Sequence, residues 1–169
     1  MVIDIHTHCF PDSLSERAVS FLAEKSGIPH HTDGTVKDLK RSMREAGIDI
    51  SVLQPIATRP EQTAGINRWA AEVQDENIKS FGTIHPDCPD WKEQIEFLVS
   101  HGIRGVKFHP EYQNFYVDDK KLFSIYDALF SKGLAVLFHA GADLGFFPLC
   151  HCPPGRLRKV ADLFPKAKI

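Results

Sequence analysis

The sequence of 169 residues lacks any long apolar run and any cluster of basic residues. Its opening, MVIDIHTHCF, has neither the basic start nor the extended apolar segment that marks a signal peptide or a membrane anchor. Because the net charge is −2 and the basic residues are dispersed, neither nucleic acid nor a membrane is expected as a partner. The four cysteines are scattered, which predicts no disulfide framework and favours a cytoplasmic location.

The first predicted strand is expected to be buried. No glycine-rich nucleotide-binding motif follows it. Apolar runs predict strands at residues 2–6, 49–57, 80–85, 103–109 and 134–139, with a sixth opening at residue 166. Helical periodicity, capping residues and glycine stops predict helices at residues 12–25, 36–46, 60–75, 89–101, 118–131 and 155–164. This alternation is typical of an α/β protein with a parallel sheet, and the absence of a linker favours one domain, 1–169.

Histidines are plentiful, with nine in the chain, and several of them follow directly on predicted strands. Candidate ligands that recur at the carboxyl ends of parallel strands are how (β/α)8 TIM barrels build their sites, so we predict this fold. A TIM barrel usually needs about 250 residues. The chain is therefore expected to be truncated after about five and a half βα units. The unpaired strand edges of such a truncated chain predict domain swapping or a homo-oligomer.

His6 and His8 are the first candidate metal ligands. In an extended strand their side chains point to one side, roughly 6–7 Å apart. His139, at the end of the fifth predicted strand, can complete a set of three imidazole ligands. Three neutral nitrogen donors with one open position suit zinc, which lowers the pKa of a bound water to about 7. We therefore predict that the protein binds one or two divalent ions, preferably zinc, and acts on a small-molecule substrate.

Lys107, His109 and Glu111 are expected to share one face of the fourth predicted strand. A lysine inside a barrel is costly unless it is paired. Three explanations of Lys107 are open: an ion pair with Glu111 or Asp143, contact with an anionic group of the substrate, or carboxylation to a carbamate that bridges two metal ions. His85 and His109, each followed by proline, either line a substrate pocket together with Glu111 or cap their strands structurally.

The segment Cys150-His151-Cys152 is a weak metal signal, because no distant cysteine pair completes a site. Loop packing is the simpler explanation, and the role of Cys150 and Cys152 stays open. The remaining histidines are expected on the surface: His30, His31 and His101.

Five stretches of the chain resemble the amidohydrolase-related family, the metal-dependent TIM-barrel hydrolases of the amidohydrolase superfamily. They are IDIHTHCFPD, MREAGIDISVLQPIAT, FGTIHPDCPD, RGVKFHPEYQNF and VLFHAGAD. Together they cover nearly the whole chain in the right order, and the combination is far more specific than a single H-x-H. The resemblance implies a (β/α)8 barrel with a divalent metal, usually zinc, at its carboxyl-terminal mouth.

When the chain is matched to the family by position, the resemblance implies that His6 and His8 are the strand-one ligands and His139 is the strand-five ligand. It also places Lys107 where some members of the superfamily have a bridging carboxylated lysine. The family's strand-six histidine and its strand-eight aspartate, the general base, are expected beyond Ile169, so the fragment is expected to be incomplete for catalysis.

The main functional prediction is a metal-dependent hydrolase that uses a metal-activated water. Three alternatives stay open: a metal-dependent decarboxylase of a small aromatic or semialdehyde acid, a phosphoesterase resembling the polymerase-and-histidinol-phosphatase family, and a catalytically inactive metal-binding barrel.

Overall fold

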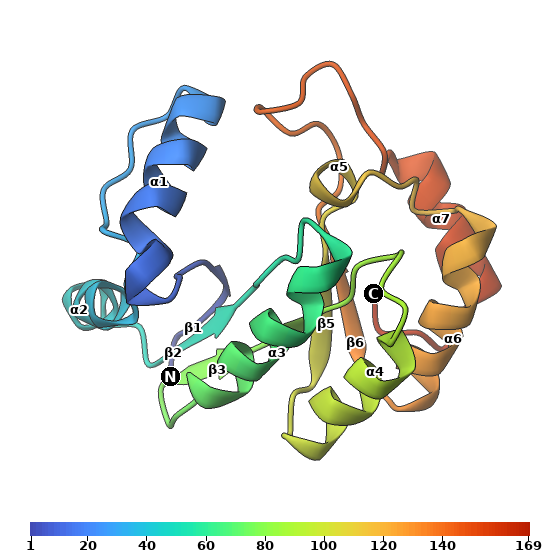
Figure 1. Ribbon diagram of the computed structural model, residues 1–169, viewed down its shortest axis with the longest axis horizontal. Helices are drawn as coiled ribbons and strands as arrows, with labels where there is room; N and C mark the ends of the chain where they lie inside the picture. The colour runs from blue at the N-terminus through green and yellow to red at the C-terminus, as the bar shows by residue number, and fades with distance from the viewer.

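A computed structural model describes residues 1–169, in which parallel strands alternate with helices (Figure 1). The strands are β1 (Ile3–Thr7), β2 (Ile50–Leu53), β3 (Ile78–Ser80), β4 (Gly82–Thr83), β5 (Gly105–Phe108) and β6 (Ala135–Phe138). The helices are α1 (Asp12–Ser26), α2 (Val36–Ala46), α3 (Thr63–Glu72), α4 (Trp91–Ser100), α5 (Pro110–Gln113), α6 (Phe123–Ser131) and α7 (Pro154–Leu163), with 3-10 helices η1 (Pro60–Gln62) and η2 (Lys120–Leu122). No helix combines the length and the apolar character that crossing a membrane requires.

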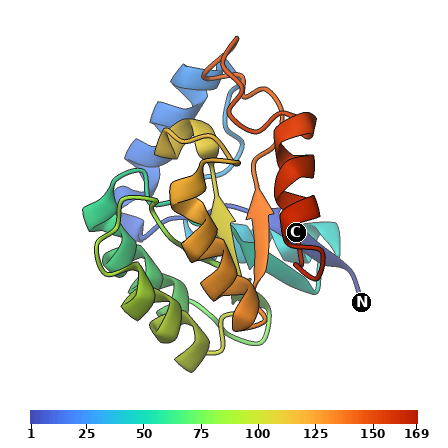
Figure 2. The same ribbon diagram turned by 90° about the vertical axis from the view of Figure 1, so that its right-hand side faces the viewer.

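The strands pair in the order in which they occur along the chain. One three-stranded parallel sheet contains β1, β2 and β3, and a second contains β4, β5 and β6. The second sheet follows directly on the first, because Phe81 alone separates β3 from β4 and its amide donates to the carbonyl of Leu53 in β2. Helices α4, α6 and α7 lie on one side of β5 and β6 (Figure 1 and Figure 2). The predicted α/β class with parallel strands is confirmed.

The main apolar core lies around β4, β5 and β6 and contains 17 buried residues. Phe108 at the end of β5 packs against Phe138 at the end of β6, with ring centroids 5.6 Å apart, and both pack against Tyr126 of α6. Burying aromatic side chains of this size stabilises a fold by about 1.5–3 kcal/mol each. Because these two phenylalanines directly precede His109 and His139, the core determines where both histidines leave the sheet.

Helix α2 confirms the prediction at both of its ends. Thr35 precedes it in an extended conformation, and its Oγ1 accepts a hydrogen bond from the amide of Asp38 at 3.1 Å. Gly47 ends it with a φ of 68°, a left-handed conformation that glycine adopts without a steric cost. Local sequence signals were sufficient here because both caps are made by residues next to the helix.

The prediction that the first strand is buried is wrong. Ile3 is 45% exposed and Ile5 is 60% exposed. The physical reason is that β1 is an edge strand, since it pairs with β2 alone.

Two other strand predictions are also corrected. The predicted strand at 80–85 is replaced by the two short strands β3 and β4. The segment from Lys166 to Ile169 forms no strand, although the carbonyl of Lys168 accepts a hydrogen bond from the amide of Val136 in β6 at 2.8 Å. A single backbone bond beside β6 is not enough to extend the sheet.

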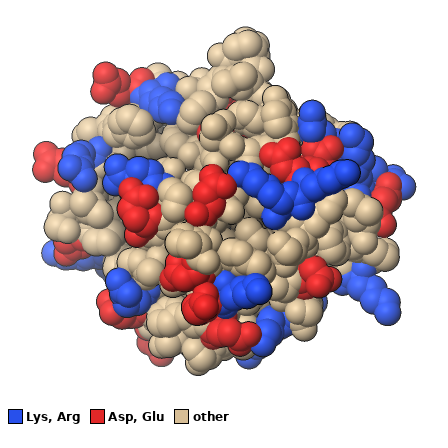
Figure 3. Space-filling view, turned by 45° about the vertical axis from the view of Figure 1, so that its right-hand side comes forward, with Lys and Arg blue, Asp and Glu red and all other residues tan.

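Acidic and basic side chains are interspersed on the molecular face drawn in Figure 3. Exposed ion pairs such as Lys121 with Asp87 and Lys132 with Glu96 contribute to this mixture over the surface as a whole. Pairs of this kind add at most about 1 kcal/mol each. The surface charge therefore does little to determine the fold.

Gly82 lies in β4 at a position where a side chain would enter the core. A Cβ there would be 2.3 Å from Leu98 Cδ2, and Leu98 is fully buried in α4. We expect Gly82→Ala to lower the free energy of unfolding by about 1–3 kcal/mol, because it overpacks the core.

Gly65→Ala is the matched control for this substitution, since a Cβ at Gly65 meets nothing within 4 Å. It is expected to stabilise α3 by up to about 1 kcal/mol. Urea denaturation measures both variants, and equal midpoints for wild type and Gly82→Ala would show that Leu98 does not occupy this space.

Candidate metal centre

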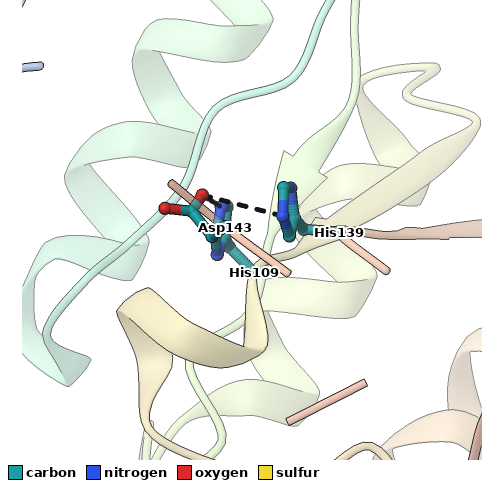
Figure 4. A group of neighbouring side chains, drawn as sticks. All are labelled: His109, His139 and Asp143. Carbon is teal, nitrogen blue, oxygen red and sulfur yellow. Dashed lines mark ion pairs between the residues drawn. The ribbon is translucent and has the colours of Figure 1, made fainter. Parts of the chain in front are cut away.

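His109 and His139 directly follow two neighbouring strands, β5 and β6. The strands run parallel with Phe108 opposite Phe138, and the amide of His139 donates to the carbonyl of Phe108 at 3.0 Å. The two imidazole rings consequently stack, with centroids 4.2 Å apart and an angle of 12° between their planes. Two nitrogen donors are thereby placed side by side at the carboxyl ends of the strands (Figure 4).

Asp143 reaches the same place from the loop between β6 and α7. Its Oδ2 lies 3.3 Å from His109 Nε2 and 3.6 Å from His139 Nε2, as the dashed lines in Figure 4 show. One ligand atom from each of the three residues lies within 4.8 Å of the other two. The sequence indicates Asp143 only as a candidate partner of Lys107. Its position four residues after His139 is the one sequence signal for a role beside the histidines.

Contacts inside the loop and outside it hold Asp143 in place. The amide of Gly145 donates to Asp143 Oδ1 at 2.8 Å, and the amide of Gly141 donates to the carbonyl of Cys152 at 3.0 Å. The ring of Phe146 lies under the ammonium of Lys25 in α1, with Nζ 3.5 Å from the ring centroid. This cation–π contact ties the loop to a helix that is remote in sequence.

The donor group of His109, His139 and Asp143 fits a divalent metal ion. The Nε2 atom of His139 is buried without a hydrogen-bond partner, and buried polar atoms are nearly always partnered. Two imidazole nitrogens and one carboxylate oxygen are donors that zinc and other transition-metal ions accept. Burial lowers the pKa of His109 to about 3, with smaller contributions from His139 and Lys107. The ring is therefore neutral at physiological pH, which is the form that binds metal.

His6 and His8 form a pair at the end of β1, with ring centroids 5.2 Å apart. Partial burial lowers the pKa of His6, with a smaller contribution from the charge of Lys107. Neither His6 nor His8 belongs to the group within 4.8 Å that contains His139 and Asp143. The structure thus does not bring the predicted set of His6, His8 and His139 to ligand distance, and this set stays a prediction.

Lys107 lies in β5 with 1% of its surface exposed, and its Nζ has no hydrogen-bond partner. Burial lowers its pKa to about 8, although the nearby Cys152 acts in the opposite direction. The expected pairing with Glu111 or Asp143 is wrong. Asp143 faces the two histidines, and Glu111 lies on helix α5 instead of continuing the strand. Contact with an anionic substrate group and carboxylation stay open as explanations of this buried amine.

Glu111 contacts two histidines from its buried position. Its Oε1 accepts a hydrogen bond from the amide of His151 at 2.8 Å, and its Oε2 lies 3.6 Å from His109 Nδ1. His85 is buried as well, but its Nδ1 accepts from the amide of Asp87 at 3.1 Å, within its own turn. This bond supports the structural explanation of His85. Substrate binding by His85, His109 and Glu111 stays a prediction.

The four cysteines are all free, as their scattered positions predicted. Cys152 is buried and Cys150 is half-buried at the base of the loop that carries Asp143. The histidines expected on the surface are exposed: His30, His31 and His101.

Residues 3–169 match the model of a protein family described as amidohydrolase. The chain belongs to the amidohydrolase family. This confirms the family that the five sequence stretches predicted. No curated protein matches the chain.

Solved structures similar to this amidohydrolase chain include three enzymes. The 5-carboxyvanillate decarboxylase LigW from Sphingomonas paucimobilis has a TM-score of 0.71 at 14% identity, and the match covers 98% of this chain and 65% of that one. The related LigW2 from Novosphingobium aromaticivorans, with bound manganese and 3-methoxy-4-hydroxy-5-nitrobenzoic acid, has a TM-score of 0.64 at 13% identity, covering 99% and 56%. Apo IDCase from Metarhizium anisopliae has a TM-score of 0.64 at 18% identity, covering 82% and 50%.

At such low identity, these likenesses concern the fold alone. The amidohydrolase chain spans between 50% and 65% of the length of the three structures.

Proposed function

We propose that this chain is part of a metal-dependent enzyme that decarboxylates a small carboxylic acid. The observation that carries the proposal is the group of buried His109 with half-buried His139 and Asp143 at the carboxyl ends of β5 and β6. A bound divalent metal would supply positive charge to stabilise negative charge that develops on the substrate. Zinc is the ion predicted from the sequence, and the similar LigW2 structure contains manganese; either ion accepts imidazole and carboxylate ligands.

We further propose that the strands belong to a (β/α)8 barrel. The sequential order of β1 to β6, all parallel, supports this architecture. A doubly wound sheet instead reverses its strand order at the switch point where ligands bind. The candidate donors His109 and His139 stand at the carboxyl ends of their strands, where barrel enzymes place their sites.

The buried amine of Lys107 supports a carboxylic acid as substrate. With a pKa of about 8 it is mostly protonated at pH 7, and a carboxylate would supply the counter-charge that the chain does not offer. Its charge also lowers the pKa values of His6, His8 and His109, so it lies beside the candidate ligands. In this proposal the histidines and Asp143 hold the metal, and Lys107 binds and orients the carboxylate.

The proposal is tested on the purified full chain. Metal content is measured by plasma mass spectrometry, and CO2 release is followed with a panel of aromatic and aliphatic acids. We expect about one divalent ion per chain, and metal-dependent CO2 release when the protein also contains the strand-six histidine and the strand-eight aspartate that the family resemblance implies. Lys107→Met is expected to abolish that release, and the exposed Lys79→Met is the matched control.

The alternatives give different results in the same experiment. Hydrolysis of esters or amides without CO2 release would favour the metal-dependent hydrolase. Acids that bind to the metal-loaded chain without turnover would favour the inactive barrel, and a chain that retains no metal after reconstitution would contradict all three.

A further inference from the structure

Glu111 is a buried carboxylate held between two histidines. Its side chain is fully buried, and its Oε1 accepts the backbone amide of His151 at 2.8 Å. The other oxygen, Oε2, has no hydrogen-bond partner, and it faces His109 Nδ1 at 3.6 Å. The Nδ1 atom is also buried without a hydrogen-bond partner. Two polar atoms that lack partners therefore face each other, separated by slightly more than a hydrogen-bond length.

The position of Glu111 is set by the short helix α5, which is anchored on both sides. Gln113 Oε1 accepts a hydrogen bond from the amide of His109 at 2.9 Å. The amide group of the same side chain donates to the carbonyls of Ala57 and Ile84. Because these bonds tie α5 to the segments that follow β2 and β4, Glu111 has little freedom to turn towards another partner.

We propose that Glu111 is a positioning residue that holds the His109 ring with its proton on Nδ1. An ionised carboxylate can only accept hydrogen bonds, so Oε2 stabilises the tautomer that carries a proton on the facing nitrogen. With a cation bound, the Nε2 atom of His109 would then direct its lone pair to that ion, beside Asp143 and His139. Histidines that bind metals commonly donate their second ring nitrogen to a carboxylate in this way. This inference rests on the proposed metal site.

The same carboxylate connects His109 to the loop that supplies Asp143. The Oε1 atom of Glu111 holds the amide of His151, next to Cys152, whose carbonyl closes the loop through the amide of Gly141. One buried side chain thus positions a donor from β5 and the base of the loop that carries another donor.

Glu111→Gln separates orientation of the ring from support of the loop. The glutamine oxygen still accepts the amide of His151, while its amide group places a donor opposite His109 Nδ1. The ring is then expected to move its proton to Nε2, which removes the lone pair facing Asp143. We expect the affinity for Zn²⁺ alone to fall by roughly 10–100-fold. Glu93→Gln, the same exchange at an exposed glutamate of α4, is the matched control and is expected to leave the affinity unchanged.

The experiment combines calorimetric titration of the apo full chain with Zn²⁺ and NMR of isotope-labelled histidine rings, assigned with His109→Gln. The inference requires a proton on His109 Nδ1 in the wild type titrated with Zn²⁺ and on Nε2 in Glu111→Gln. A wild-type ring that is protonated on Nε2 in the presence of Zn²⁺, or bound to Zn²⁺ through Nδ1, overturns it even if the variant does not fold. A variant with wild-type tautomer and affinity also overturns it and leaves Glu111 as support of the loop alone. A wild type with the expected tautomer that binds no Zn²⁺ contradicts the proposed function instead.

Discussion

His139→Ala is expected to eliminate tight metal binding. His139 belongs to both candidate donor sets, because it stacks on His109 beside Asp143 and is also the predicted third ligand of His6 and His8. Losing a direct ligand should lower the affinity by more than the roughly 10–100-fold that loss of an outer partner costs. Calorimetric titration with Zn²⁺ and metal analysis of the purified chain measure this effect. The exposed His30→Ala is the matched control and should bind as the wild type does.

A second pair of variants decides which donor set holds the ion. If His6→Ala combined with His8→Ala keeps the wild-type affinity while Asp143→Asn loses it, the metal lies between β5 and β6. The reverse pattern would place the ion on the H-x-H pair of β1. Wild-type affinity in His139→Ala would contradict both arrangements, because neither set is then essential.

Lys107→Met is expected to stabilise the apo protein while removing the proposed carboxylate contact. Burial lowers the pKa of Lys107 from 10.5 to about 8, which corresponds to about 3 kcal/mol of destabilisation when the amine is protonated. Below pH 8 both the folded and the unfolded chain carry the charge, so the folded state bears this whole cost. A methionine of similar length removes the charge and fills the same space, and it should raise the free energy of unfolding by a similar amount at pH 7.

The pH dependence identifies the cause of this stabilisation. Between about pH 8 and pH 10.5 the folded wild type has lost the proton that the unfolded chain still binds, so its stability rises with pH relative to Lys107→Met. Above about pH 10.5 both states are neutral and the advantage of the variant should vanish. Urea denaturation at pH 7, 9 and 10.5, with Lys79→Met as control, measures the difference. A constant difference over this range would show that packing, not the buried charge, is responsible.

The sequence by itself determined the α/β class and the family, and it predicted candidate ligands at the carboxyl ends of the strands. Helix α2 could be delimited to the residue, because Thr35 and Gly47 form its caps locally. His109 and His139 were recognised as candidates because parallel strands place their carboxyl ends at one edge. Signals of this kind depend only on neighbours in the chain and on the period of the strand.

The tertiary structure decided which acidic residue joins the histidines. Asp143 becomes a donor because Cys152 and Gly141 close its loop and Phe146 packs against Lys25 of α1. These contacts join segments remote from one another, so no local pattern in the sequence could indicate them. The exposure of β1 has the same origin: its apolar residues resemble those of a buried strand, and only the pairing order shows that it lies at an edge.

Lys107 and Glu111 show, within a single segment, the same contrast between what the sequence predicts and what the tertiary structure decides. The period of two correctly placed Lys107 in the interior, but it also placed Glu111 on the strand, although the strand ends at Phe108 and Pro110 opens a helix. That helix turns the carboxylate away from the lysine and towards His109 and His151. In this segment the sequence periodicity identified the buried residues, whereas the direction in which a buried charge points depends on where the backbone changes from strand to helix.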